Sequence, residues 1–67
     1  MDFRQLESFI AIAKNKSFSK AAKELYLTQP TISNHIQTLE KEIGTSLLNR
    51  ANRDITLTKA GEIFYDY

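Results

Sequence analysis

The sequence predicts a mainly α-helical domain with a small β-hairpin, in the order of three helices, the hairpin and a fourth helix. Apolar residues recur at three- and four-residue spacing along most of the chain, which is typical of helices that bury one face. Between residues 46 and 57 the spacing changes to a two-residue alternation beside a polar turn, which is typical of a hairpin. The 67 residues are enough for one small domain.

The composition is that of a globular protein, with 42% hydrophobic and 25% charged residues. The chain has no cysteine, which excludes disulfides and thiolate metal sites. No apolar run approaches the roughly 18 residues that a membrane span needs, so we expect a cytoplasmic domain with no membrane partner. The net charge of +1 is too small to indicate nucleic-acid binding by itself.

The first two helices are predicted over residues 3–14 and 18–25. The apolar spacing that marks the first helix is formed by Phe3, Leu6, Phe9, Ile10 and Ala13. Asn15 can serve the end of that helix, and Ser17 can cap the start of the next. Four residues of the second helix are predicted to face inward, namely Phe18, Ala21, Ala22 and Leu25.

A third helix is predicted over residues 29–42. Thr28 is a good N-cap, and Pro30 is tolerated in the first turn because the first N–H groups have no partner within the helix. Gly44 supplies a C-terminal cap. A turn of about three residues joins the second helix to the third, so residues 18–37 have the layout of a helix-turn-helix.

The predicted hairpin covers residues 46–57, and Thr58 is expected to cap the last helix. Leu47 and Leu48 precede a polar turn at residues 51–54, and the alternating ITLT segment follows it. A hairpin after a helix-turn-helix forms a wing. We therefore expect a winged helix-turn-helix domain over residues 1–58, with a further helix beginning in residues 58–67.

Helix three has two unlike faces. At about 100° per residue, four apolar side chains fall within a sector of about 60° and define a buried stripe, namely Ile32, Ile36, Leu39 and Ile43. The opposite side carries Pro30, Asn34, Gln37 and Lys41, with Ser33 and Thr38 on the flanks. The exposed face of the N-terminal half is therefore polar and almost uncharged, whereas an ordinary solvated helix more often carries Glu–Lys pairs.

This face predicts sequence-specific binding to double-stranded DNA, with helix three in the major groove. Asparagine and glutamine amides match the donor and acceptor of adenine there, and apolar groups can touch a thymine methyl. Serine and threonine hydroxyls can reach base edges or phosphates. The predicted base-contacting residues are Gln29, Pro30, Thr31, Ser33, Asn34 and Gln37.

The wing and the helix starts are predicted to hold the DNA backbone. Arg50 and Arg53 flank the hairpin turn, and arginine is favoured in a narrow minor groove. The start of helix two offers free N–H groups, the helix dipole and a lysine to a phosphate. The predicted phosphate contacts are Ser17, Lys20 and Thr28.

The single histidine, His35, does not indicate a catalytic or metal site. It lies about 70° from the buried stripe, which places it at the boundary with helix two or the hairpin. No cysteine or carboxylate pair accompanies it at metal-ligand spacing, and the chain has no Gly-rich phosphate loop. We therefore expect no enzymatic activity, no metal ion and no cofactor in this domain.

The sequence resembles the N-terminal DNA-binding domain of the LysR-type transcriptional regulators of bacteria over essentially its whole length. The matching motifs are SFSKAA, LTQPTIS, IxxLEKEIG, LxR and LTKAG. The resemblance implies a longer chain in which a following domain binds a small-molecule effector. It also implies that the helix from Thr58 is a linker helix, which pairs domains into a homodimer or tetramer on an interrupted inverted repeat. The chain is expected to stop early in that helix, which leaves Phe64, Tyr65 and Tyr67 without much of a dimer partner.

The resemblance also carries residue roles. By position, Gln29, Pro30 and Ser33 match the family's base- and phosphate-contacting residues, and Arg50 and Arg53 match its wing residues.

Three residues depart from the family pattern. Asn34 stands where many members have arginine, His35 replaces a common glutamine, and Leu48 replaces a frequent phenylalanine. The first departure concerns DNA contact, and the third concerns packing under the wing.

Two alternatives share this fold. A winged helix can serve as a protein–protein interaction module, although such modules usually lack wing arginines and an amide-rich helix three. Salt-dependent binding to duplex DNA would separate that function from DNA recognition. The domain could also come from another winged-helix repressor family, against which the SFSKAA and LTKAG segments argue.

Overall fold

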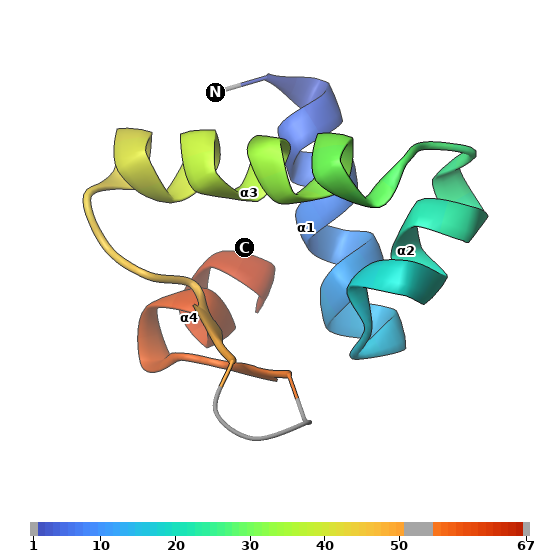
Figure 1. The fold of residues 1–67 in the computed structure, drawn as a ribbon. Helices are drawn as coiled ribbons and strands as arrows, with labels where there is room; N and C mark the ends of the chain where they lie inside the picture. The colour runs from blue at the N-terminus through green and yellow to red at the C-terminus, as the bar shows by residue number, and fades with distance from the viewer. Residues whose placement is uncertain (1, 51–54, 67) are drawn as a thin grey trace.

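The computed structural model describes residues 2–50 and 55–66. It contains four helices and two short strands, in the predicted order (Figure 1). The elements are α1 (Phe3–Asn15), α2 (Phe18–Leu25), α3 (Gln29–Ile43), β1 (Leu48–Asn49), β2 (Thr56–Leu57) and α4 (Lys59–Asp66). The predicted fold class is therefore confirmed, and the first three helices begin and end within one residue of their predicted bounds.

The helix ends follow from local hydrogen bonding, as predicted. Ser17 Oγ accepts the Lys20 N–H at 3.1 Å, and Thr28 Oγ1 accepts the Thr31 N–H at 3.3 Å. Gly44 ends α3 with a φ of 87°, a left-handed conformation that glycine adopts without strain. These caps satisfy backbone groups that a helix leaves without an internal partner.

Asn15 serves the end of α1 through its side chain. Its amide nitrogen donates to the Ala11 carbonyl at 2.8 Å and to Glu24 Oε1 at 3.1 Å. The left-handed C-cap itself is Lys16, with a φ of 54°. Asn15 therefore also links α1 to α2, which the sequence did not indicate.

The core lies where α1, α2 and α3 meet and extends to the residues that lead into β1. Its buried apolar residues are Phe9, Ala11, Ile12, Ala21, Ala22, Ile32, Ile36, Leu39, Leu47 and Leu48. Figure 1 shows α2 and α4 beneath opposite ends of α3. The inward positions predicted for Ala21 and Ala22 are confirmed, and their small side chains let the neighbouring helices approach closely.

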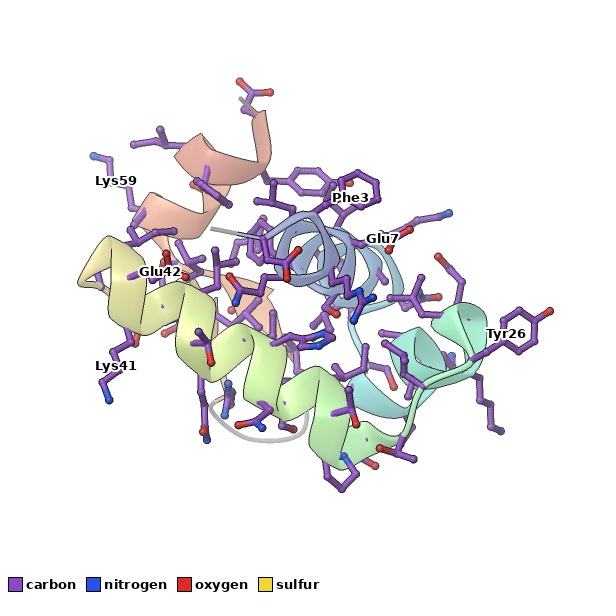
Figure 2. All side chains as sticks on the ribbon, turned by 90° about the horizontal axis from the view of Figure 1, so that it is seen from above. Phe3, Glu7, Tyr26, Lys41, Glu42 and Lys59 are labelled. Carbon is purple, nitrogen blue, oxygen red and sulfur yellow. The ribbon has the colours of Figure 1, made fainter. Side chains whose placement is uncertain are left out.

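The buried face of α1 is rotated from the apolar spacing that marked this helix. Phe3 is 73% exposed and stands on the outer side of α1 (Figure 2), and Ile10 is 49% exposed. Ser8 and Ala11 are buried instead. Close contact with two neighbouring helices favours small residues at the crossing. Of the predicted apolar set, Phe9 is buried and Leu6 packs against the core, whereas Phe3 and Ile10 lie outside it.

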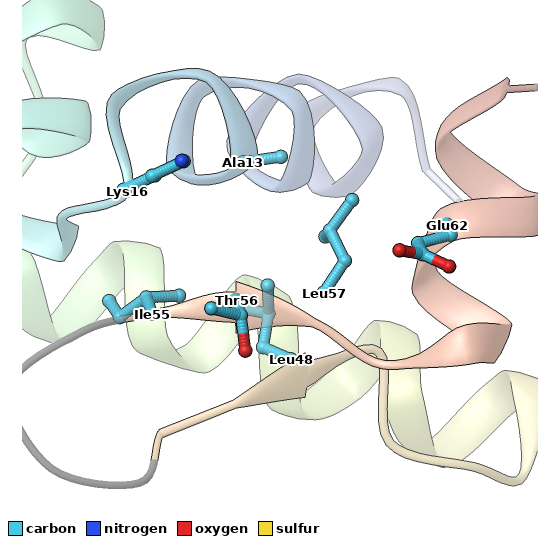
Figure 3. Close-up of a pocket in the computed structure, with 7 residues that line it drawn as sticks. All are labelled: Ala13, Lys16, Leu48, Ile55, Thr56, Leu57 and Glu62. Carbon is cyan, nitrogen blue, oxygen red and sulfur yellow. The ribbon is translucent and has the colours of Figure 1, made fainter.

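The two strands form a short antiparallel hairpin that depends on the helices. Leu48 pairs with Leu57, and Asn49 pairs with Thr56. Figure 3 shows Leu57 pointing towards α1, in a pocket that the hairpin forms with α1 and α4. So short a hairpin would be marginal alone. The paired residues cover less than the predicted wing of 46–57, and the predicted turn at 51–54 lies outside the described residues.

The start of α4 is fixed against the segment before β1. The Thr58 N–H donates to the Leu47 carbonyl at 3.0 Å, and its hydroxyl donates to the Ser46 carbonyl at 2.7 Å. The same hydroxyl oxygen accepts the Gly61 N–H at 3.0 Å, so Thr58 caps α4 as predicted.

The aromatic residues of α4 have partners within the domain. Phe64 packs edge-on against the ring of Phe9, with centroids 5.5 Å apart, and Tyr65 does so at 6.2 Å. α4 therefore folds back onto α1, and the expected loss of a dimer partner at Phe64 and Tyr65 stays a prediction.

We predict that Gly61→Ala destabilises the domain by about 1–3 kcal/mol, as overpacking does. A Cβ at residue 61 would overlap the carbonyl oxygen of Leu47, which is backbone and cannot turn aside. This clash opposes the gain in stability of about 1 kcal/mol that alanine normally brings when it replaces glycine inside a helix. Urea unfolding measures the difference, with the exposed Lys59→Ala in the same helix as the control. An equal or higher stability for Gly61→Ala would contradict the close packing of α4.

Candidate nucleic-acid interface

The outer face of α3 is polar, as predicted. Ile32, Ile36 and Leu39 are fully buried, and Ile43 packs partly against the core. The opposite residues Pro30, Asn34, Gln37 and Lys41 are all exposed, and Figure 2 shows Lys41 pointing away from the rest of the domain. The exposed amides stand on a helix whose opposite side is anchored in the core, so they have a rigid base.

The N-terminal turn of α3 holds several of its side chains in mutual hydrogen bonds. The hydroxyls of Thr28 and Thr31 lie 2.8 Å apart. The Ser19 hydroxyl, in the first turn of α2, donates to the amide oxygen of Gln29 at 3.3 Å. Thr31 and Ser33 are half-buried, whereas Gln29 is exposed with Pro30, Asn34 and Gln37. The structure thus gathers all six residues at one helix, and their contacts with bases stay a prediction.

The start of α2 differs in one respect from the predicted phosphate site. The Lys20 N–H is not free, because the Ser17 hydroxyl accepts it. A phosphate there would meet the earlier N–H groups of the first turn and the exposed Lys20 side chain. The contact from Ser19 to Gln29 brings this turn beside the start of α3. The turn that carries Ser17 and Lys20 therefore lies beside the start of α3, where Thr28 is the N-cap.

Arg50 lies at the base of the hairpin and is held by both neighbouring helices. Its guanidinium carbon is 4.9 Å from the centre of the Phe18 ring, at the start of α2. One of its nitrogens is 4.0 Å from Glu40 Oε1 on α3. The side chain remains 45% exposed, so it presents positive charge next to the α2 start. Arg53, the other predicted wing residue, lies outside the described residues.

Glu40 is a residue whose role sequence reasoning missed. Its Oε2 accepts the Leu47 N–H at 2.8 Å and the Leu48 N–H at 3.3 Å, while its Oε1 faces Arg50. The carboxylate therefore joins α3 to β1 and to the wing arginine. The sequence did hold a signal. Glu40 is an acidic residue directly after the apolar stripe residue Leu39, and the apolar pair Leu47 and Leu48 follows soon after the helix ends.

His35 lies at the boundary with α2, one of the two predicted positions, and its hydrogen bond is to α1. It lines a pocket with Glu24 and Leu25 of α2, and its Nδ1 lies 2.8 Å from the hydroxyl of Ser8 on α1. Helical spacing gives the angle of His35 from the buried stripe but does not say which element covers that side. Within residues 2–50 and 55–66, no group of three or more side chains could hold a metal ion.

A family model described as the bacterial regulatory helix-turn-helix protein of the lysR family matches residues 3–62. The chain belongs to the LysR family. Its relatives include the transcriptional regulator BudR of Raoultella terrigena, 49% identical over 65 residues, and AlsR of Bacillus subtilis, 48% identical over 67 residues. The alignments cover 97% and 100% of this chain but 22% of each relative, so the chain spans about a fifth of their length.

Solved LysR structures share the fold closely. A crystal structure of a BenM_DBD/benA site 1 DNA complex has a TM-score of 0.96 and 43% identity, covering 100% of this chain and 75% of that one. A CbnR_DBD–DNA complex has a TM-score of 0.93 and 45% identity, covering 98% and 76%.

The three departures from the LysR pattern lie in different environments. Asn34 is exposed on the outer face of α3, where it is free to contact a partner. Leu48 is buried in the core, in keeping with a role in packing under the wing. His35 is half-buried and hydrogen-bonded to α1.

Among the described residues, no helix is long and apolar enough to cross a bilayer.

We predict that Glu40→Ala destabilises the domain by about 1–3 kcal/mol, because it leaves the N–H groups beside buried Leu47 and Leu48 without their acceptor. Glu40→Gln keeps an oxygen acceptor and is expected to cost less. Urea unfolding compares both with Thr38→Ala, an exposed substitution on the same helix. If Glu40→Ala costs no more than Thr38→Ala, the carboxylate does not anchor the hairpin.

Proposed function

We propose that this domain binds double-stranded DNA sequence-specifically, as the DNA-binding domain of a bacterial LysR-type transcriptional regulator. The observation that carries the proposal is the outer face of α3, where exposed, uncharged Asn34 and Gln37 stand opposite a fully buried apolar stripe. DNA complexes of relatives at 43% and 45% identity, with the same fold, support it.

In the proposed complex, the N-terminal half of α3 enters the major groove. This half carries the residues whose side chains offer both hydrogen-bond donors and acceptors to base edges. The first turn of α2 faces a phosphate with its N–H groups and Lys20, and the Thr28 end of α3 lies close by. The wing arginines Arg50 and Arg53 would contact the adjacent minor groove, with Arg50 held at the wing base by Glu40 and Phe18.

We further propose the setting of this domain in a longer protein. Two copies, related by a twofold axis through the helix that begins at α4, would bind the half-sites of an interrupted inverted repeat. Half-site centres then lie about one DNA turn apart or a multiple of it. A separate domain would bind a small-molecule effector, in a homodimer or tetramer acting in the cytoplasm. This domain would need no cofactor and catalyse no reaction.

We predict that Asn34→Ala weakens binding to a selected duplex by about 1–3 kcal/mol and relaxes base preference at one position. Asn34 is exposed and makes its contact through a short amide, so its loss should affect one base pair. Fluorescence titration against duplexes varied at each position measures the effect. Glu7→Ala on the exposed side of α1 is the control (Figure 2). A uniform loss across all duplexes would make Asn34 a backbone contact instead.

We predict that Lys20→Ala lowers the slope of log K against log salt by about one unit, because one phosphate contact is lost. Base preference should stay as in the parent. Titrations at several salt concentrations measure the slope, with the exposed Lys59→Ala as a charge-matched control on α4. An unchanged slope would remove the α2 start from the interface, and binding of no duplex by the parent would favour a protein-interaction module.

A further inference from the structure

A side-chain contact joins the starts of the two helices of the helix-turn-helix. The Ser19 hydroxyl donates to the amide oxygen of Gln29 at 3.3 Å. Ser19 lies in the first turn of α2, and Gln29 is the first residue of α3. Both residues are exposed. The contact therefore lies at the surface that the proposed function assigns to DNA.

Neither helix needs this contact to close its end. The Ser17 hydroxyl already caps α2 by accepting the Lys20 N–H. Thr28 caps α3 by accepting the Thr31 N–H and pairs with the Thr31 hydroxyl. The bond from Ser19 to Gln29 adds no cap, so its effect falls on the orientation of the Gln29 side chain.

Orientation matters because the glutamine amide has two unlike ends. A free glutamine can bind adenine in the major groove through both ends, since its oxygen accepts from N6 and its nitrogen donates to N7. The Ser19 hydroxyl takes one of the two lone pairs of this oxygen and holds the oxygen towards α2. With the oxygen turned to α2, the NH₂ group is the end left to face a base, and it can only donate.

We propose that Ser19 is a positioning residue that sets which base Gln29 recognises. With its oxygen held, Gln29 favours base edges that offer acceptors: guanine through O6 and N7, or thymine through O4. Adenine loses its advantage because the oxygen that would accept from its N6 donor is turned towards α2, and cytosine presents a donor where Gln29 also donates. This inference rests on the proposed DNA binding and names one determinant of its specificity.

The test begins with a duplex selected from a random pool by the parent chain. Gln29→Ala identifies the base pair that Gln29 recognises, as the position where discrimination is lost. Four duplexes that differ only at that pair are then titrated with the parent, Ser19→Ala and Ser19→Thr. Circular dichroism and urea unfolding check that each variant is folded.

The parent is expected to prefer guanine or thymine at this position. Ser19→Ala releases the amide oxygen from α2, so binding to the adenine duplex should gain relative to the others. The ratio of the guanine or thymine Kd to the adenine Kd should rise by about fivefold or more. Preferences at other positions should not change. Ser19→Thr keeps the hydroxyl and should retain the parental ratio of Kd values. If Ser19 acted only on the stability of the fold, the ratio at this one base pair would not depend on the hydroxyl.

Several results would overturn the inference while leaving DNA binding intact. These are a parental preference for adenine, an unchanged ratio in Ser19→Ala, a Ser19→Thr variant that behaves like Ser19→Ala, and a Gln29→Ala variant that loses no discrimination. An equal loss for all four duplexes in Ser19→Ala would make Ser19 a phosphate contact and would also overturn it. If the parent binds no duplex at all, the proposed function itself is wrong.

Discussion

The position of the hairpin relative to α3 depends on the carboxylate of Glu40. One of its oxygens accepts two backbone N–H groups at the start of β1, and the other faces the Arg50 guanidinium. Both N–H groups belong to buried residues, and a buried donor must find an acceptor. Hydrogen bonds to an ionised acceptor are roughly twice as strong as neutral ones. A single group therefore orients both the wing and its arginine against the helix that carries the amides.

Leu47 extends this constraint to α4. Its N–H is held by Glu40, its carbonyl accepts from Thr58, and its side chain is fully buried. Gly61 allows α4 to lie directly on the same carbonyl. Since α3 and α4 share one rigid joint, a second domain paired through α4 would have its own α3 at a fixed spacing and angle. In the proposed dimer, this joint transmits the geometry of the pairing helix to the DNA.

The sequence predicted those features that depend on neighbouring residues. The caps at Ser17, Thr28 and Gly44 act within four residues, and the two faces of α3 follow from helical spacing. Contacts between residues that lie far apart in the sequence could not be predicted from local spacing. The hydrogen-bond partner of His35 is Ser8 on α1, which helical spacing alone does not indicate. Glu40 becomes an anchor only because the chain returns past it at residues 47 and 48. For the candidate site, the exposure of its helix face was predictable, but the bond from Ser19 to Gln29 was not.

The balance of charge and amides has a consequence for affinity. The described cations around the proposed interface are few, chiefly Lys20, Lys41 and Arg50, and the chain carries a net charge of only +1. Each phosphate contact contributes about 0.9 to the salt slope, so we expect one domain to bind non-specific DNA weakly. Asn34 adds no charge but can discriminate a base pair by about 1–3 kcal/mol. Affinity must then come from joining two domains, because the second half-site is bound at a high effective concentration. Such a domain is suited to bind its site tightly only as part of a pair.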